Sequence, residues 1–413
     1  MIANSHIKKA AYDGTLSTVA AMQAQYDDLR CDYSAAKETR FQKRPDGIFS
    51  QGSGADYHYR NASDYYYMIE LFRNMVRNDQ FVSQGIRTLV ANIVLDGFTV
   101  KPKTGDRNLD DNLEERWKNW TADENVNVDF ERKKNWHTIE QLGLESIIVD
   151  GDCGLNPISD GSLQCFEAHR MRSPTRRARA NGNTLVHGVE QNSFNRVVRY
   201  WLTANDYDGL NKFTFKPSEF RKVPAASRDV ITGINEQNFF HMYHPRRFTQ
   251  NRGMSFLAPC STTSGMLDDV QFAKLVQQQI VSYFAIIHNM DADDEFGPPD
   301  AASKVADPCD DTETRDRTPL SPGAEYYSEP GETITGFSPN VPNAEFFNQA
   351  NMLMAFIATN IDCPLMLLLM DASTTNFSGW RGAMDQAKIR WRRIQRWYGS
   401  DCHSRVYRWK CRQ

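Results

Sequence analysis

The sequence predicts an α+β protein in which helical segments flank a region of short strands. Apolar residues recur at steps of three and four in four segments, which is the period of an amphipathic helix: 65–95, 110–148, 261–290 and 343–362. Between 155 and 245 short β-type runs alternate with Gly and Asn turns. The 413 residues suffice for two or three modules, so one chain can hold both kinds of region.

Composition narrows the class of protein. With 40% hydrophobic and 24% charged residues the chain is expected to fold, and its net charge of −4 gives no global DNA-binding signature. Any contact with DNA is therefore expected to be local or transient. No stretch approaches the roughly 18 apolar residues of a membrane span. The eight cysteines lack CxxC spacing, which favours reduced thiols, and we expect neither a metal nor another cofactor.

The N-terminal part divides near residue 64. Residues 1–64 are polar, and their Gly-Ser stretches indicate an arm that is ordered only against a neighbour. Residues 65–95 fit helices interrupted near Asn78-Asp79. In the helical pattern of 110–148, Trp117 and Trp120 share one face.

Three runs in the next region predict strands: Leu163–Glu167, Thr184–Glu190 and Val197–Leu202. His241 and His244 follow, and they suggest catalysis at first sight. No nucleophile motif such as G-x-S-x-G accompanies them, so structural histidines at a strand edge are favoured.

Two long helices enclose an acidic segment. A helix over 261–290 would be about 45 Å long. The helix over 343–362 is predicted to end at Cys363-Pro364, because proline disfavours helix at the preceding residue. Between 291 and 332, thirteen acidic and three basic residues give a local charge of −10. A solvated loop and a pair of hairpin-like turns, at Pro322-Gly323 and Pro330-Gly331, both remain open for this segment.

The last part of the chain is a polar link followed by a basic helix. Residues 363–379 begin apolar and become small and polar, which suits a mobile loop between rigid elements. A helix is predicted to begin near Trp380. It contains one acidic residue, Asp385, and six basic residues: Arg381, Lys388, Arg390, Arg392, Arg393 and Arg396.

The run Asn376–Arg381, Asn-Phe-Ser-Gly-Trp-Arg, resembles the Asn-Tyr-Ser-Ser-x-Arg run of lambda-type portal proteins of tailed phages. Gln250-Asn251-Arg252-Gly253, followed by Leu257-Ala258-Pro259, is similar to the Gln-x-Arg-Gly and Leu-Ala-Pro of that family. Asp150-Gly151-Asp152 resembles its acidic-Gly-acidic motif. Phe377 and Gly379 depart conservatively from the pattern, and the resemblance covers about residues 60–400.

The resemblance implies a portal fold assembled as a ring. Its parts would be a mixed α/β wing, a two-helix stem, a small α/β clip and a tunnel loop. The implied boundaries are 1–64 for an N-terminal arm, 65–260 for the first part of the wing, 261–290 for the first stem helix, 291–342 for the clip, 343–362 for the second stem helix, 363–379 for the tunnel loop, and 380–413 for a wing helix and a C-terminus without the family's crown.

The implied function is a non-enzymatic channel for double-stranded DNA at one capsid vertex of the virion. The ring, by resemblance a dodecamer assembled in the host cytoplasm, would serve genome packaging, retention and ejection. Its partners would be terminase, the head-tail adaptor and the major capsid protein, with no membrane. The absence of a phosphate-loop motif agrees with a separate motor. Two alternatives remain open: a hydrolase or nuclease using His, Asp and Glu of 238–335, and a tail or adaptor component.

The resemblance also assigns the candidate site residues, none of them catalytic. Loop residues expected to face the DNA are Asp371, Ser373, Thr374, Thr375, Asn376 and Ser378. Clip residues expected to dock the adaptor or terminase are Asp307, Asp310, Asp311, Glu313, Tyr326 and Tyr327. The six basic residues of the wing helix are expected mostly to pair with acidic neighbours in the wing.

Overall fold

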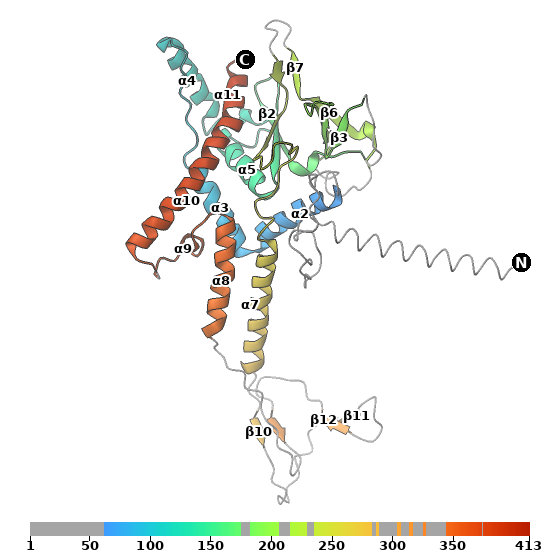
Figure 1. Ribbon diagram of the computed structural model, residues 1–413, viewed down its shortest axis with the longest axis vertical. Helices are drawn as coiled ribbons and strands as arrows, with labels where there is room; N and C mark the ends of the chain where they lie inside the picture. The colour runs from blue at the N-terminus through green and yellow to red at the C-terminus, as the bar shows by residue number, and fades with distance from the viewer. Residues whose placement is uncertain are drawn as a thin grey trace, which may run out of the picture. The chain divides into compact units, whose positions relative to one another are not determined.

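The computed structural model in Figure 1 describes residues 62–174, 182–205, 215–228, 235–282, 286–288, 304–306, 314–316, 325–327, 344–373 and 375–413. The chain divides into two compact units, a larger one from 1–264 and 354–413 and a smaller one from 265–353. Nearly all of the expected arm, 1–64, lies outside the described residues.

The larger unit begins with four helices: α2 (Ala62–Asn78), α3 (Gln80–Val94), α4 (Arg107–Thr121) and α5 (Trp136–Val149). Asp79 separates α2 from α3, because its carboxylate accepts the free amides of Phe81 and Val82 at the start of α3. The interruption predicted near Asn78-Asp79 is confirmed.

A three-stranded antiparallel sheet follows α5 directly. Its central strand is β1 (Asp152–Pro157), with β2 (Leu163–Glu167) on one side and β9 (Phe240–Tyr243) on the other. The strand predicted at 163–167 is confirmed in both bounds. The helix-to-strand connection is only Asp150-Gly151, so α5 and β1 hold each other in a fixed relation.

A four-stranded antiparallel sheet covers residues 184–224, in the order β3 (Thr184–Val186), β4 (Val189–Gln191), β5 (Val197–Thr203) and β6 (Phe220–Pro224). The run Thr184–Glu190 was predicted as one strand, and that prediction is wrong. His187 and Gly188 both have positive φ and turn the chain between β3 and β4. A further pair, β7 (Ala226–Arg228) and β8 (Asn235–Gln237), is antiparallel.

The C-terminal segment returns to the larger unit as one long helical rod, visible in red in Figure 1. It consists of α10 (Phe377–Tyr398), the π-helical turn η6 (Gly399–His403) and α11 (Ser404–Lys410). Tyr407 of α11 contacts the ring of Trp117, which with Trp120 and Trp136 forms an aromatic cluster. The shared face predicted for Trp117 and Trp120 is confirmed, since both are buried.

The smaller unit contains most of α7 (Ser261–Ser282) and the first part of α8 (Ala344–Asn360). The Nζ atom of Lys274 lies 5.7 Å from the ring centre of Phe346, so the two helices touch there. The helix predicted over 261–290 is too long. The chain changes to strand at Ile286 and Ile287, whose branched side chains favour β structure.

Four short strands complete the described part of this unit. The pair β10 (Ile286–His288) and β13 (Glu325–Tyr327) is parallel, and the pair β11 (Lys304–Ala306) and β12 (Thr314–Asp316) is antiparallel. The turns expected at Pro322-Gly323 and Pro330-Gly331 lie outside the described residues.

Candidate functional site

The segment between α8 and α10 is a short loop built around one helical turn. Its turn is α9 (Leu365–Leu368), and Asp362 and Met370 flank it with φ of 54° each. Such left-handed backbone ends a helix, so these two residues terminate α8 and α9. The prediction of an irregular link over 363–379 is therefore wrong in part. Its apolar beginning forms the helical turn α9, which packs against the protein through the buried Leu368. Its last three residues belong to α10.

Helix α3 holds the first half of this loop. A Cβ atom on Gly85 would lie 2.9 Å from Cδ1 of Ile361 and 3.3 Å from Cδ1 of Leu368, so α9 packs against the bare backbone of α3. The side-chain amide of Asn360 donates to the backbone carbonyl of Phe256 at 2.7 Å. The beginning of the loop is thereby fixed.

The second half of the loop is held by α10. Asn376 is its N-cap, and its side-chain oxygen accepts from the amide of Gly379 at 2.7 Å. Farther along, the side-chain amide of Gln395 donates to the backbone carbonyl of Ile93 at 2.9 Å. The hydroxyl of Tyr398 donates to the backbone carbonyl of Glu140 at 2.8 Å. The loop thus lies between two ends that α3 and α5 anchor.

The tip of the loop is exposed and polar, with apolar neighbours. Asp371 and Ser373 are exposed, and the amide of Ser373 donates to Asp371 at 2.8 Å. This hydrogen bond lowers the pKa of Asp371, which favours its charged form. Met370 and Phe377 flank the tip with exposed fractions of 72% and 79%. Neither residue was among the predicted loop residues, although each directly adjoins the polar run in the sequence.

The other predicted loop residues are spread over different environments. Thr374 lies outside the described residues, and Thr375 is half-buried. Asn376 is engaged as the N-cap, and Ser378 is in the first turn of α10. The structure therefore places Asp371 and Ser373 together at the tip and the later residues at the helix start.

All six basic residues predicted on the wing helix are exposed on α10. Among the described residues only Arg390 approaches a carboxylate, with its Nε atom 3.8 Å from Asp362. The expected pairing with acidic neighbours is therefore almost absent within the described part of the chain.

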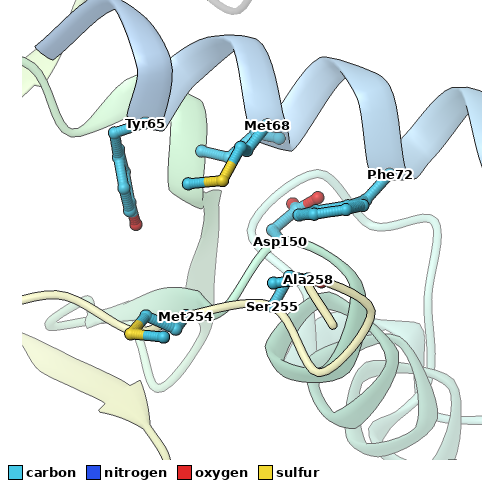
Figure 2. A pocket seen from close by; sticks show the side chains of 8 residues that line it. Tyr65, Met68, Phe72, Asp150, Met254, Ser255 and Ala258 are labelled. Atoms are coloured by element: carbon cyan, nitrogen blue, oxygen red, sulfur yellow. The ribbon is translucent and has the colours of Figure 1, made fainter. Parts of the chain in front are cut away.

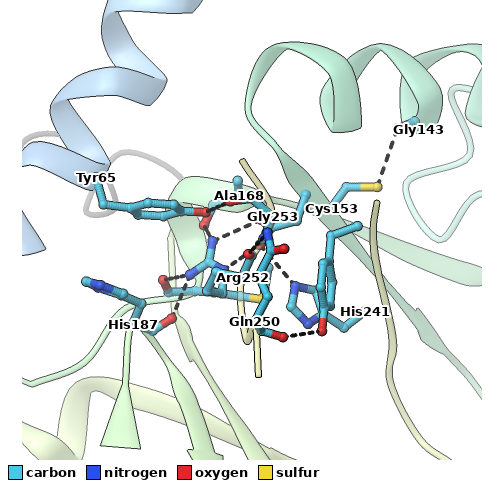
Figure 3. A network of polar contacts seen from close by, with 12 residues as sticks. Tyr65, Gly143, Cys153, Ala168, His187, His241, Gln250, Arg252 and Gly253 are labelled. Carbon is cyan, nitrogen blue, oxygen red and sulfur yellow. Dashed lines mark hydrogen bonds and ion pairs between the residues drawn. The ribbon is translucent and has the colours of Figure 1, made fainter. Parts of the chain in front are cut away.

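A buried ion pair holds the larger unit together beneath α2, as Figure 3 shows. Arg252 is 0% exposed, and its guanidinium binds both oxygens of Asp152, with Nε–Oδ2 at 2.5 Å and Nη2–Oδ1 at 3.0 Å. Its remaining N–H groups donate to the carbonyls of Ala168 (2.7 Å), Met171 (2.9 Å) and His187 (2.6 Å). A planar guanidinium suits several simultaneous partners of this kind.

Asp152 has two further donors, His241 Nε2 and the amide of Gly253, each at 3.0 Å. Burial acts to raise the pKa of Asp152, but the charge of Arg252 and the hydrogen bond of His241 hold it below the usual value. Burial also lowers the pKa of His241, which favours its neutral ring. A ring nitrogen beside a carboxylate must donate, so the contact with Asp152 favours the tautomer with the proton on Nε2. These contacts are those of a structural histidine, which was the favoured interpretation.

The two glycines of this region allow the backbones to touch. A Cβ on Gly253 would lie 1.8 Å from the carbonyl oxygen of Gly151, whose φ is +105°. The sequence analysis quoted Asp150-Gly151-Asp152 and Gln250–Gly253 as separate motifs. The structure brings them together as one site, and nothing in their local spacing could have revealed this.

Asp150, two residues before Asp152, lines the small pocket shown in Figure 2. This pocket has a volume of about 10 Å³ and is lined by α2 and the segment after Gly253. Arg73 binds Asp150 with Nε–Oδ1 at 2.8 Å and Nη2–Oδ2 at 2.5 Å. Burial nevertheless raises the pKa of Asp150 to about 6.

Metal-binding groups and clefts in the described residues bear on the hydrolase alternative. None of the described His, Cys, Asp and Glu side chains form a group of three that could hold a metal. A cleft of about 310 Å³ beside α11 is lined by three basic residues, two apolar residues, and a threonine, a tyrosine and a cysteine: Lys103, Arg408, Arg412, Pro102, Leu113, Thr104, Tyr407 and Cys411. Of the expected docking residues, Tyr326 and Tyr327 are on β13, and the other four lie outside the described residues.

Comparison with known proteins places these features in a family. A family model described as "Phage portal protein, lambda family" matches residues 50–395, which include the Arg252 region, α7, α8, the loop and most of α10. A comparison with curated proteins gave no match. Among the described residues, no helix combines the length and apolar character needed to cross a membrane.

Proposed function

Because the chain belongs to the lambda family of phage portal proteins, we propose that it assembles into a closed ring that carries double-stranded DNA through one capsid vertex. Residues 65–260 and 380–413 of the larger unit are assigned to the wing, α7 and α8 to the two stem helices, 291–342 to the clip, and 363–379 to the tunnel loop. Packaging, retention and ejection of the genome would use this channel.

The loop between α8 and α10 carries this proposal. A tunnel loop must present a tip to passing DNA without being displaced by it. Here α3 and α5 anchor both ends of the loop, while Asp371 and Ser373 at the tip are exposed. A charged, polar tip neutralises no phosphates, so DNA would not be held there.

The exposed apolar residues of the smaller unit support assembly into a ring. Met266, Phe272 and Leu275 on α7 are exposed by 52%, 61% and 58%, and Phe347 and Met352 on α8 by 62% and 49%. Large apolar side chains left exposed on two neighbouring helices favour a surface that another protein covers. Copies of the same stem, related by a rotation that closes, would bury them as a ring, by resemblance a dodecamer.

The partners follow from the position of such a ring in the virion. The major capsid protein would surround the wing, and terminase and then the head-tail adaptor would bind the clip. The acidic clip residues Asp307, Asp310, Asp311 and Glu313 are the proposed docking charges, with Tyr326 and Tyr327 beside them. The family is structural, so the work of packaging would come from the terminase.

Native mass spectrometry and negative-stain imaging of the purified protein test the proposal. We expect a ring of identical subunits with a central opening. A protein that stays monomeric or dimeric at high concentration would contradict it.

Replacing Asp307, Asp310, Asp311 and Glu313 by Asn or Gln tests the proposed docking charges of the clip. The change should slow adaptor association and weaken the salt dependence of that association, while rings still form.

A further inference from the structure

Four basic residues of α10 form a line on one side of the helix. Arg381, Lys388, Arg392 and Arg396 recur at steps of seven, four and four, so they share a face, and all four are exposed. We call these four residues the basic stripe. At 1.5 Å per residue it extends over about 22 Å.

The packing of α10 fixes the direction of the basic stripe. The opposite side is buried through Trp391, Ile394 and Tyr398, and hydrogen bonds from Gln395 and Tyr398 attach it to α3 and α5. The helix therefore cannot rotate to hide its cations. No carboxylate of the described residues lies within ion-pair distance of the basic stripe, and the pair of Arg390 with Asp362 lies outside it.

This concentration of positive charge is local. Residues 377–413 contain ten Lys or Arg and two Asp, a net charge of +8, whereas the whole chain has −4. Because the net charge of the whole chain is negative, the chain as a whole does not attract polyanions. The positive charge of α10 to α11 would attract a polyanion locally.

We propose that the basic stripe contacts the phosphates of duplex DNA, an inference that rests on the proposed portal function. Duplex DNA carries one charge per roughly 1.7 Å with both strands counted, so a 22 Å line of cations runs along a stretch of duplex that carries about 13 phosphates, of which it faces those on one side. Such contacts are independent of sequence and exchange easily, so the DNA is held and can still slide.

An acidic protein surface is the competing partner, and the composition of the stripe disfavours it. Arg is common in protein interfaces, but the affinity of such interfaces depends on buried aromatic anchors beside it. Between Arg381 and Arg396 the large apolar residue exposed on α10 is Ile389, while the exposed aromatic Phe377 lies before the basic stripe, at the start of the helix. Contacts along the length of the basic stripe would therefore be mainly ionic, as they are with phosphates.

Salt dependence of DNA binding by the assembled, full-length protein tests the proposal. A fluorescent 30-base-pair duplex is titrated with the protein between 50 and 200 mM KCl, and the slope of log K against log salt concentration is measured. Since each phosphate contact contributes about 0.9 to this slope, K388Q/R392Q/R396Q should reduce it by at least about 2.7. R392K/R396K keeps the charge and should keep the slope.

R107Q/R116Q/R390Q is the matched control, because it removes three exposed cations outside the basic stripe. Its slope should equal that of the unaltered protein. If K388Q/R392Q/R396Q forms rings with an unchanged slope, the stripe does not contact DNA, and the portal function still stands. If that variant loses its rings while the slope per chain is unchanged, the stripe faces a neighbouring copy, which also overturns the inference. Absence of rings in the unaltered protein would contradict the portal function, and the slopes would still decide the role of the stripe.

Discussion

The buried guanidinium of Arg252 stays charged because Asp152 and three backbone carbonyls accept its N–H groups. Replacing it by Met would leave Asp152 buried and negative, with only His241 and the amide of Gly253 as donors. Removal of one partner of a buried ion pair costs about 3–5 kcal/mol. We expect Arg252→Met to lower the free energy of unfolding by that amount, measured by urea denaturation. Arg252→Lys should also destabilise, because an ammonium cannot bind Asp152 and three carbonyls together.

Arg199→Met provides the control, since Arg199 is exposed on β5. Its effect should stay within about 0.5 kcal/mol. Equal stabilities for Arg252→Met and Arg199→Met would show that the buried pair contributes little beyond the packing around it.

Asp150 and Asp152 give opposite contributions to the pH dependence of stability. The folded pKa of Asp150, about 6, exceeds its unfolded value of about 3.9, so the folded state binds the extra proton between these values. Stability from Asp150 is therefore lost as pH rises from 4 to 6. Asp152, whose folded pKa is depressed, contributes stability above pH 4 that is lost on acidification.

Asp150→Asn isolates the first of these effects, since Asp152 is present in both proteins. Between pH 4 and 6 the unaltered protein should lose up to about 3 kcal/mol relative to Asp150→Asn, with no further change from pH 7 to 8. Urea denaturation at each pH measures the difference. A difference that does not vary with pH would mean that burial leaves the pKa of Asp150 near its ordinary value.

At the scale of elements, the cap of α10 decides how long the loop is. Asn376→Ala removes the acceptor of the Gly379 amide and should cost about 1 kcal/mol. The first turn of α10 should then fray, and hydrogen exchange at Phe377–Trp380 should accelerate. Ser378→Ala, exposed within the same turn, serves as the control and should leave exchange unchanged. Equal protection in both variants would show that packing, and not the cap, sets the start of α10.

Elements with a local cause were predictable from the sequence. Asp79 interrupts a helix through its own carboxylate, and the Trp117–Trp120 spacing fixes a helical face. Features set by distant residues were not. The turn α9 forms because Gly85, nearly 300 positions earlier, leaves room for Leu368. The partner of Asp152 is 100 residues away, so no local pattern pairs them.

At the scale of the whole molecule, the exposed side chains of the stem should govern assembly. Phe272→Gln with Leu275→Gln removes two large apolar groups from α7 that are already solvent-exposed in the single chain. We expect the chain to fold with unchanged helicity, while native mass spectrometry shows rings replaced by smaller species. Phe194→Gln removes an aromatic that is even more exposed, at 87% against 61% for Phe272, from the turn between β4 and β5 and should leave rings intact. Rings that persist in the stem variant would place the subunit contacts elsewhere.

The position of Arg252 along the chain also has a consequence for biosynthesis. All the partners of its side chain precede it, from Tyr65 to His187, so the ribosome has already made them when residue 252 emerges. Until then Asp152 lacks its counter-charge, which discourages premature closure of the nascent core. Translation from residue 252 to residue 413 takes roughly 8–30 s at 5–20 residues per second, long enough for this core to close. The loop and the basic helix are thus synthesised after every partner of the Arg252 side chain.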